Sequence, residues 1–187
     1  MNVQVAQGLP MIRPFLAGAV MAFSLAVGAQ AAVVDSSPGG FEVSQSVEIA
    51  APAAKVWAAL GQPGKWWNPE HSWSGKPEAL SLSLTPGGCF CEILANGGGA
   101  EHMRVIFVAP GHEARLEGAL GPFQFSGASG HLRWVLTEKD GKTTFTQTFD
   151  AGGYFKGGID KMPGPVDGVL SEQLGRLKQY VETGAPT

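Results

Sequence analysis

Only a few residues have types and positions suited to chemistry in a sheltered site. Glu92 lies two residues after Phe90, so if Phe90 faces the interior of a strand, the carboxylate faces it too. A carboxylate among apolar side chains has a raised pKa and can act as a general acid or base. Alternatively, Glu92 lies near its strand end and reaches water. Gln147, between Phe145 and Phe149, is a second polar residue on an otherwise apolar strand face.

His71 lies in the tryptophan-dense segment 65–73 and could donate a hydrogen bond to a ligand, or be an ordinary surface histidine. His102 and Arg104 share a strand face that the alternation predicts to be the outer one. Glu92 and His71 are therefore the catalytic candidates. The sequence contains no nucleophile elbow, zinc-protease motif, phosphate loop or dinucleotide fingerprint. It therefore predicts no cofactor and indicates no particular reaction.

Cys89 and Cys91 are separated by one residue. In a straight strand their Cα atoms would lie near the upper limit for a disulfide, and the ring would be strained. A metal site lacks a further cysteine or a nearby histidine in the sequence. We interpret the pair as two free, partly buried thiols, with a redox-active disulfide and then a metal site as the alternatives, and we predict no metal.

Composition limits the class of protein. The 187 residues carry a formal charge of −3 without a basic run, which argues against a nucleic-acid partner or an anionic membrane surface. Charged residues make up only 16% of the chain, and glycine is abundant at 27 residues. This composition favours a turn-rich domain with strands and a large apolar interior over a helical bundle.

Residues 1–31 resemble a secretory signal peptide. Arg13 supplies a positive charge, an apolar run follows from Phe15 to Gly28, and Ala29 and Ala31 form an A-x-A cleavage site before Ala32. The alternative, a membrane anchor, would need about 20 apolar residues, more than this run contains. We expect a periplasmic or secreted protein with no membrane span after cleavage, and loss of Arg13 changes its charge from −3 to −4.

The remaining chain predicts a polar spacer over residues 32–40 and one domain over residues 41–184. Alternation and turn signals predict seven short strands, with a hairpin across Asp140-Gly141. The segment from Pro163 to Val181 has apolar residues at steps of three and four and predicts a long helix that Gly184 ends. The fold class is therefore α+β. The strands are expected at residues 41–49, 80–84, 89–94, 102–108, 113–118, 131–137 and 143–149, with two short helices after the first strand.

Three local motifs carry a resemblance to a known family. They are residues 47–60 (VEIAAPAAKVWAAL), the strand entry 86–90 (PGGCF) and the helix 166–178 (VDGVLSEQLGRLK). Together they resemble the START-like, or SRPBCC, superfamily with its Bet v 1-like helix-grip fold, and within it the branch of polyketide cyclases and of the activator of the heat-shock ATPase. The resemblance implies a curved antiparallel sheet wrapped over the C-terminal helix. It does not define an activity, because members include lipid carriers, cyclases and chaperone cofactors.

The resemblance also implies a ligand cavity between sheet and helix, although the same residues could form a solid core. Trp66, Trp67 and Trp73 could line its mouth or form a separate cluster under the short helices. The expected ligand-binding residues are those that alternation and helical spacing turn inward, namely Trp66, Trp67, Phe90, Met103, Val105, Phe107, Leu116, Trp134, Phe145, Gln147, Phe149, Val166, Leu170 and Leu174.

Three functions remain open at this point. The first is an exported protein that holds a hydrophobic small molecule, a lipid or an aromatic compound, in this cavity. The second is a cyclase- or hydrolase-type enzyme that uses a pocket acid or base. The third is a module that contacts another envelope protein through the outer sheet face or the tryptophan segment.

Overall fold

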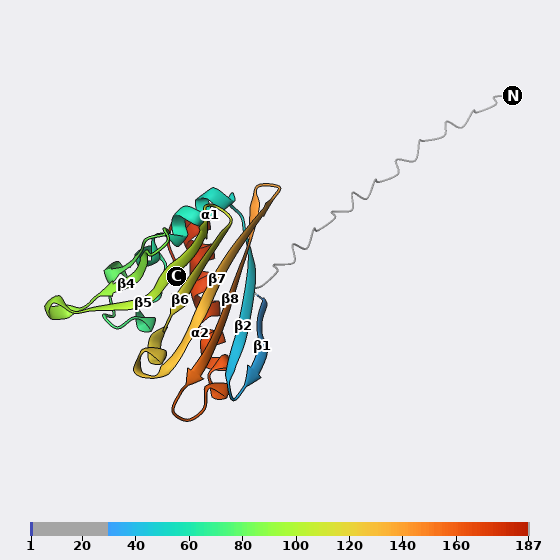
Figure 1. Cartoon of the computed structure of the whole chain (residues 1–187). Coiled ribbons are helices and arrows are strands. Elements are labelled where there is room, and N and C mark those ends of the chain that lie inside the picture. The colour runs from blue at the N-terminus through green and yellow to red at the C-terminus, as the bar shows by residue number, and fades with distance from the viewer. Residues whose placement is uncertain (2–29, 187) are drawn as a thin grey trace.

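The computed structural model describes residues 30–186 together with Met1. It contains one antiparallel sheet in the order β1-β2-β8-β7-β6-β5-β4-β3, a curved layer across which the long helix α2 lies (Figure 1). The strands are β1 (Gln30–Ser37), β2 (Gly40–Ile49), β3 (Leu80–Leu82), β4 (Cys89–Ile93), β5 (Gly99–Ala109), β6 (Glu113–Gly118), β7 (Gly127–Lys139) and β8 (Lys142–Tyr154).

All seven predicted strands are present, but the spacer predicted over residues 32–40 is wrong. Most of it forms β1, which pairs antiparallel with β2 and makes an eighth strand at the sheet edge. The segment gave no alternation signal because Val33 and Val34 both stay exposed. The predicted hairpin at Asp140-Gly141 is confirmed. Asp140 and Gly141 both have positive φ, as a two-residue turn that matches the strand twist requires.

The chain makes two α-helices, α1 (Ala53–Leu60) and α2 (Pro163–Thr183). The second short helix expected after the first strand is a series of 3₁₀ turns instead, at Pro63–Lys65, Pro69–His71 and Pro77–Ala79, each begun by a proline. Further 3₁₀ turns lie at Ala95–Gly97, Gly121–Phe125 and Ile159–Lys161. Helix α2 ends as predicted, because Gly184 adopts the left-handed conformation and donates its N–H to the Tyr180 carbonyl at 2.8 Å.

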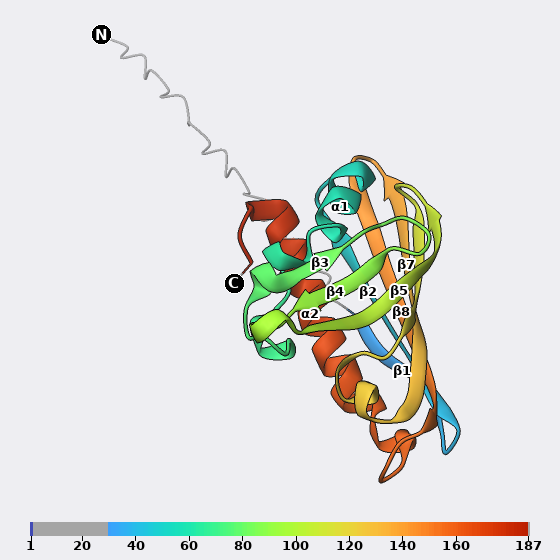
Figure 2. The same cartoon turned by 60° about the vertical axis from the view of Figure 1, so that its left-hand side comes forward.

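Helix α2 lies along one face of the curved sheet, while β3 and β4 bend round toward it (Figure 2). Its C-terminal half is packed tightly, with Leu174, Leu177 and Val181 almost fully buried. Toward its N-terminus the apolar residues Val166 and Val169 are only partly buried. The predicted apolar face of α2 is therefore confirmed. Its C-terminal half is packed against the core, whereas its N-terminal half is less tightly covered.

Two bulges in β5 change which side chains face the interior. Between the pairs Phe90–Met103 and Cys91–Glu101 the extra residue His102 is inserted, so His102 and Met103 are both buried. A second irregularity between Val105 and Phe107 reverses the alternation. The prediction that His102 faces outward and Phe107 inward is therefore wrong. His102 is 6% exposed, whereas Phe107 is 39% exposed and lies under the Arg115 guanidinium.

The predicted signal peptide lies almost entirely outside the described residues. Among the residues that the structure describes, no helix is long and apolar enough to cross a membrane. Cleavage before Ala32 would remove Gln30 and Ala31 from β1 and leave its other residues in place.

The glycines of α2 offer a test of what stabilises that helix. Gly175 is exposed in mid-helix, and an added Cβ would meet nothing within 4 Å. Gly175→Ala should therefore raise the free energy of unfolding by about 0.5–1 kcal/mol, because alanine loses less backbone entropy in a helix. Urea denaturation measures the change.

The matched control is Gly130→Ala, in β7. There a Cβ would lie 2.9 Å from the Phe149 ring and even closer to the Asp150 carbonyl, so the substitution should lower the free energy of unfolding by about 1–3 kcal/mol. A loss of stability in Gly175→Ala would contradict the exposed placement of that helix face.

Candidate functional site

A cavity of about 290 Å³ lies between the N-terminal half of α2 and the sheet. The sheet, helix α2 and the loops all contribute residues to its wall. Most of these residues are aromatic or aliphatic. The polar residues of the wall are few. The lining residues are Trp67, Glu70, His71, Ser72, Trp73, Leu80, Phe90, His102, Leu120, Gly121, Pro122, Phe123, Phe149, Met162, Pro165, Val166, Val169 and Leu170.

The structure brings only part of the predicted ligand-binding set to this cavity. Five of the predicted residues line it, and three others are buried in solid core away from it. Phe107 is excluded because it faces outward. The five are Trp67, Phe90, Phe149, Val166 and Leu170, and the three are Met103, Val105 and Leu116.

The other predicted residues surround a second, much smaller cavity of about 10 Å³. Trp66, Trp134, Phe145, Gln147 and Leu174 line it. This volume is about that of one water molecule. The Trp134 Nε1 donor at its wall has no hydrogen-bond partner in the described chain, which also suits a water rather than an organic ligand. Gln147 donates to the Leu170 carbonyl at 2.8 Å and so ties β8 to α2.

The tryptophans of segment 65–73 divide between the two proposed roles. Trp66 packs under α1 and donates its indole N–H to the Ala59 carbonyl at 2.8 Å. Trp67 lines the large cavity, with its ring 5.3 Å from that of Phe90, and Trp73 lines it while remaining 42% exposed. Trp66 and Trp67 are 3% and 6% exposed, so Trp73 is the tryptophan of this segment with a sizeable exposed surface.

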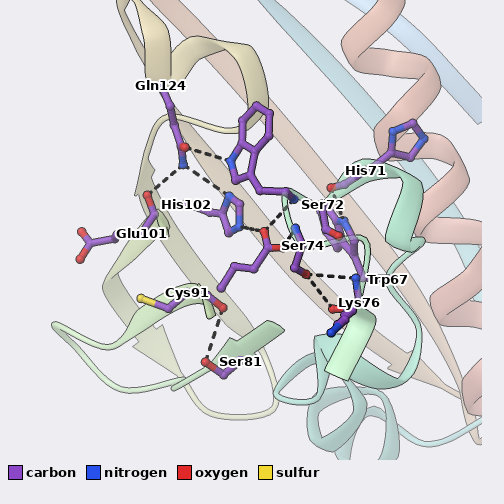
Figure 3. Close-up of polar contacts among 12 residues, drawn as sticks. Trp67, His71, Ser72, Ser74, Lys76, Ser81, Cys91, Glu101, His102 and Gln124 are labelled. Atoms are coloured by element: carbon purple, nitrogen blue, oxygen red, sulfur yellow. Dashed lines mark hydrogen bonds and ion pairs between the residues drawn. The ribbon is translucent and has the colours of Figure 1, made fainter. Parts of the chain in front are cut away.

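Glu92 is the centre of a buried polar network behind the cavity wall. Its carboxylate accepts hydrogen bonds from the backbone N–H groups of Trp73, at 3.0 Å, and Ser74. It also accepts one from His102 Nε2 at 3.0 Å. Gln124 contacts the other ring nitrogen of His102, and its side chain lies between His102 and the Glu101 backbone (Figure 3). The network thus fastens the tryptophan segment to β4 and β5.

Hydrogen bonding determines the charge state of this network. Burial alone would raise the pKa of Glu92, but hydrogen bonds from Ser74, Trp73 and His102 outweigh it and hold the pKa below its ordinary value. The predicted raised pKa is therefore wrong. Burial lowers the pKa of His102, although Glu92 opposes this shift. A carboxylate only accepts, so neutral His102 carries its proton on Nε2.

His71 lies at the cavity wall beside α2. Its Nε2 is 2.9 Å from a Glu172 carboxylate oxygen, and Asn68 donates to the other oxygen. The Asn68 hydrogen bond and then His71 hold the pKa of Glu172 below its ordinary value, although burial opposes them. Of the two catalytic candidates, His71 therefore lines the cavity directly, whereas Glu92 reaches it only through His102.

The interpretation of Cys89 and Cys91 as free thiols is wrong, because the two sulfurs are bonded. The expectation assumed that β4 is a straight strand. The two Cα atoms lie 5.3 Å apart, within the usual range for a disulfide, whereas a straight strand would hold them farther apart. The two sulfurs and the Glu101 carboxylate lie within 4.8 Å of one another, but disulfide sulfurs are not thiolate ligands.

Sequence reasoning missed several lining residues because they lie outside regular elements. Leu120 and Phe123 come from the 3₁₀ turn Gly121–Phe125 and its flank, and Phe123 is 1% exposed. A turn of five residues shows neither strand nor helix periodicity, so only the apolar composition after Gly121-Pro122 signals burial. His102 was missed because nothing in the local sequence marks the bulge.

The sequence matches the family described as polyketide cyclase / dehydrase and lipid transport over residues 40–182. This range covers most of the chain, and the protein therefore belongs to that family, within the SRPBCC-type helix-grip fold. No protein of curated function matches the sequence.

Solved structures show the same fold at low sequence identity. CalU16 from Micromonospora echinospora superposes with a TM-score of 0.55 at 14% identity, covering 79% of this chain and 78% of that one. Protein EF2215 from Enterococcus faecalis, titled a conserved protein of unknown function, gives 0.54 at 17% identity, covering 80% and 75%. Protein CV1439 from Chromobacterium violaceum gives 0.53 at 16%, covering 78% and 99%.

The buried pair predicts how stability depends on pH. His102 has a folded-state pKa below its ordinary value of 6.5, so the unfolded chain binds its proton more tightly and stability falls as the pH falls below about 6.5. Glu92 adds a further loss below its ordinary value of 4.5. His102→Gln should therefore weaken the loss of stability between pH 7.5 and 5, measured by urea unfolding at several pH values.

The matched control is His131→Gln, since the side chain of His131 is 57% exposed and faces only Asp150 at 3.5 Å. This variant should keep the pH dependence of the unaltered protein. The same pH dependence in His102→Gln as in the unaltered protein would contradict the assignment.

Proposed function

We propose that the protein binds a small hydrophobic molecule in the cavity between α2 and the sheet, and that it does so after export. Membership of the family supports a ligand-binding fold, and the cavity supports binding of a small molecule between α2 and the sheet. A solid core would leave no such volume, whereas the space here is about 290 Å³. That size is at the lower end of the range for small-molecule sites, about 300–1,000 Å³.

The wall of the cavity favours an aromatic or short-chain apolar ligand. Trp67, Phe90, Phe123 and Phe149 present ring surfaces to it. His71 and His102 bring imidazole rings to the wall, so a ligand with one polar end fits better than a pure hydrocarbon. The Nε2–H of His102 is engaged by Glu92, and its other nitrogen faces the Gln124 amide at 3.4 Å, so a ligand hydroxyl would have to displace Gln124 to bond to that nitrogen.

The bonded cysteines support export. Disulfides persist in oxidising compartments such as the bacterial periplasm and are rare in the cytosol. The apolar run from Phe15 to Gly28 and the small residues before Ala32 resemble the corresponding export signal. Intact-mass measurement of the protein from a periplasmic fraction tests this, with a chain that begins at Ala32 expected and a chain retaining Met1 contradicting it.

Filling the cavity should abolish binding. Val169 lies on α2, is only partly buried and faces the cavity, so Val169→Trp places an indole in the ligand's space. We expect the affinity for a fluorescent naphthalene-type probe to fall about tenfold or more, since the added ring occupies volume that the probe needs. Fluorescence titration gives the dissociation constant, and native mass spectrometry shows whether a co-purified adduct is lost.

The control is Val34→Trp, the same substitution on the exposed edge strand β1, where Val34 is 55% exposed. It should bind the probe as the unaltered protein does. Unchanged probe affinity in a folded Val169→Trp protein would refute binding in this cavity.

A second candidate function is acid–base catalysis in the same cavity. The observation that favours it is the His102–Glu92 pair, in which a histidine on the cavity wall is oriented by a buried carboxylate. For an enzyme, His102→Gln should reduce turnover far more than it weakens binding of the same compound. Equal losses of turnover and binding would assign His102 to ligand recognition alone.

A further inference from the structure

The Cys89–Cys91 disulfide lies on the outer face of the sheet, opposite to the cavity. Phe90 and Glu92 are buried on the inner face of β4, whereas both cysteines are only partly buried. Figure 3 shows Cys91 and Glu101 on the side of the strands away from Trp67 and His71. The bond is therefore open to attack from solvent without any change in the cavity.

Stabilisation of the fold does not account for this disulfide. A disulfide stabilises a protein mainly by restricting the unfolded chain, and the effect grows with the length of the closed loop. A sequence separation of two closes nearly the shortest loop possible. Solvent-exposed disulfides are typically the labile, regulatory or catalytic ones, and both cysteines here are partly exposed.

Charged residues of β5 surround the sulfurs. Arg104 is the cross-strand partner of Cys89, and Glu101 is that of Cys91. The Glu101 carboxylate lies 3.9 Å from Cys89 Sγ and pairs with the Arg104 guanidinium at 2.5 Å. A guanidinium beside a sulfur stabilises its thiolate, and both charged side chains are about half exposed, so neither blocks access.

We propose that Cys89 and Cys91 form a thiol–disulfide exchange site whose substrate is a thiolate, from a low-mass thiol or from a dithiol on another protein. The incoming thiolate attacks Cys91 Sγ, the sulfur–sulfur bond breaks, and Cys89 leaves as a thiolate beside Arg104. A second thiolate then attacks the partner sulfur of the mixed disulfide and releases Cys91. Two electrons pass to the cysteine pair, the partner becomes a disulfide, and the two protons it lost neutralise the new thiolates.

The site has a direct link to the inner face through Phe90. This residue lies between the two cysteines, lines the cavity and packs at 5.3 Å against Trp67 and at 5.2 Å against His102. Opening the disulfide removes the covalent restraint on the backbone on both sides of Phe90. The redox state of the pair is therefore coupled to one wall of the cavity, and Trp67 fluorescence should change on reduction.

The experiment uses the folded protein in buffers of graded reduced-to-oxidised glutathione ratio, followed by alkylation and mass spectrometry. The native protein should shift reversibly from no alkylated cysteine to two as the ratio rises. A double variant, Cys89→Ser with Cys91→Ser, supplies the unlabelled baseline. A pair that stays oxidised in excess reduced glutathione until the protein is denatured would overturn the proposal, as would two free thiols at every ratio.

The rates separate the roles of the charged neighbours. Arg104→Gln should slow reduction by glutathione about three- to tenfold, because the leaving Cys89 thiolate loses its cation. Glu101→Gln should accelerate it, since this change removes a negative charge that lies 3.9 Å from Cys89 Sγ and pairs with Arg104. Arg115→Gln, which changes an arginine paired with Glu113, should have no effect. Equal rates in all three variants would overturn the assignment of Cys89 as the leaving sulfur.

This test requires no ligand and does not depend on the proposed function. Failure of exchange would leave binding in the cavity intact, and a filled cavity would leave exchange intact. A change of tryptophan fluorescence on reduction that is absent in Trp67→Phe supports the link through Phe90, and constant fluorescence excludes it.

Discussion

The contact between helix α2 and the curved sheet is the constraint on which the rest of the molecule depends. An antiparallel sheet with one apolar face needs a second layer, and α2 supplies it. The sheet curves so that β3 and β4 bend round the helix (Figure 2), and the helix does not fill the whole concave face, because a cavity of about 290 Å³ remains. Contact is tight at Leu174 and Leu177 and loose at Val166 and Val169. The cavity is the space left where the contact loosens.

The loops around that space are held by polar bonds rather than by apolar packing alone. The Glu92 carboxylate accepts hydrogen bonds from the backbone N–H groups of Trp73 and Ser74. The backbone N–H of Asn68 donates to the side-chain oxygen of Gln173 on α2 at 2.8 Å. The tryptophan segment is thereby tied both to the sheet and to the helix. A buried carboxylate with several donors is stabilising only while all of them stay in place. The same interactions therefore hold the cavity wall in place and influence the protonation of His102.

Strand β4 places functional side chains on both faces of the sheet. Its inner residues Phe90 and Glu92 belong to the cavity wall and the buried network, while Cys89 and Cys91 form the covalent link outside. The bulge of β5 opposite Phe90 and Cys91 turns His102 inward beside Glu92, and the two cysteines are bonded on the other face. One short strand thus carries both a member of the polar pair and the disulfide.

The sequence by itself determined the features that depend on local pattern. Apolar spacing from Pro163 to Val181 and the glycine at 184 specify a helix and its end, and alternation with turn residues specifies seven strands and the Asp140-Gly141 hairpin. Family resemblance supplied their arrangement. Strand β1 was missed because its residues 32–37 are all exposed, so this part of the strand carries no alternation.

Tertiary structure alone decided the site. Bulges reverse alternation without a mark in the sequence, which is why Phe107 lies outside and His102 inside. Whether Leu174 or Val169 faces open space depends on how closely the sheet approaches each turn of α2, and no local signal reports that distance. Phe123 joins the wall from a short turn with no period. Local periodicity predicts which residues are buried, but only the packed layers determine which of them border a cavity.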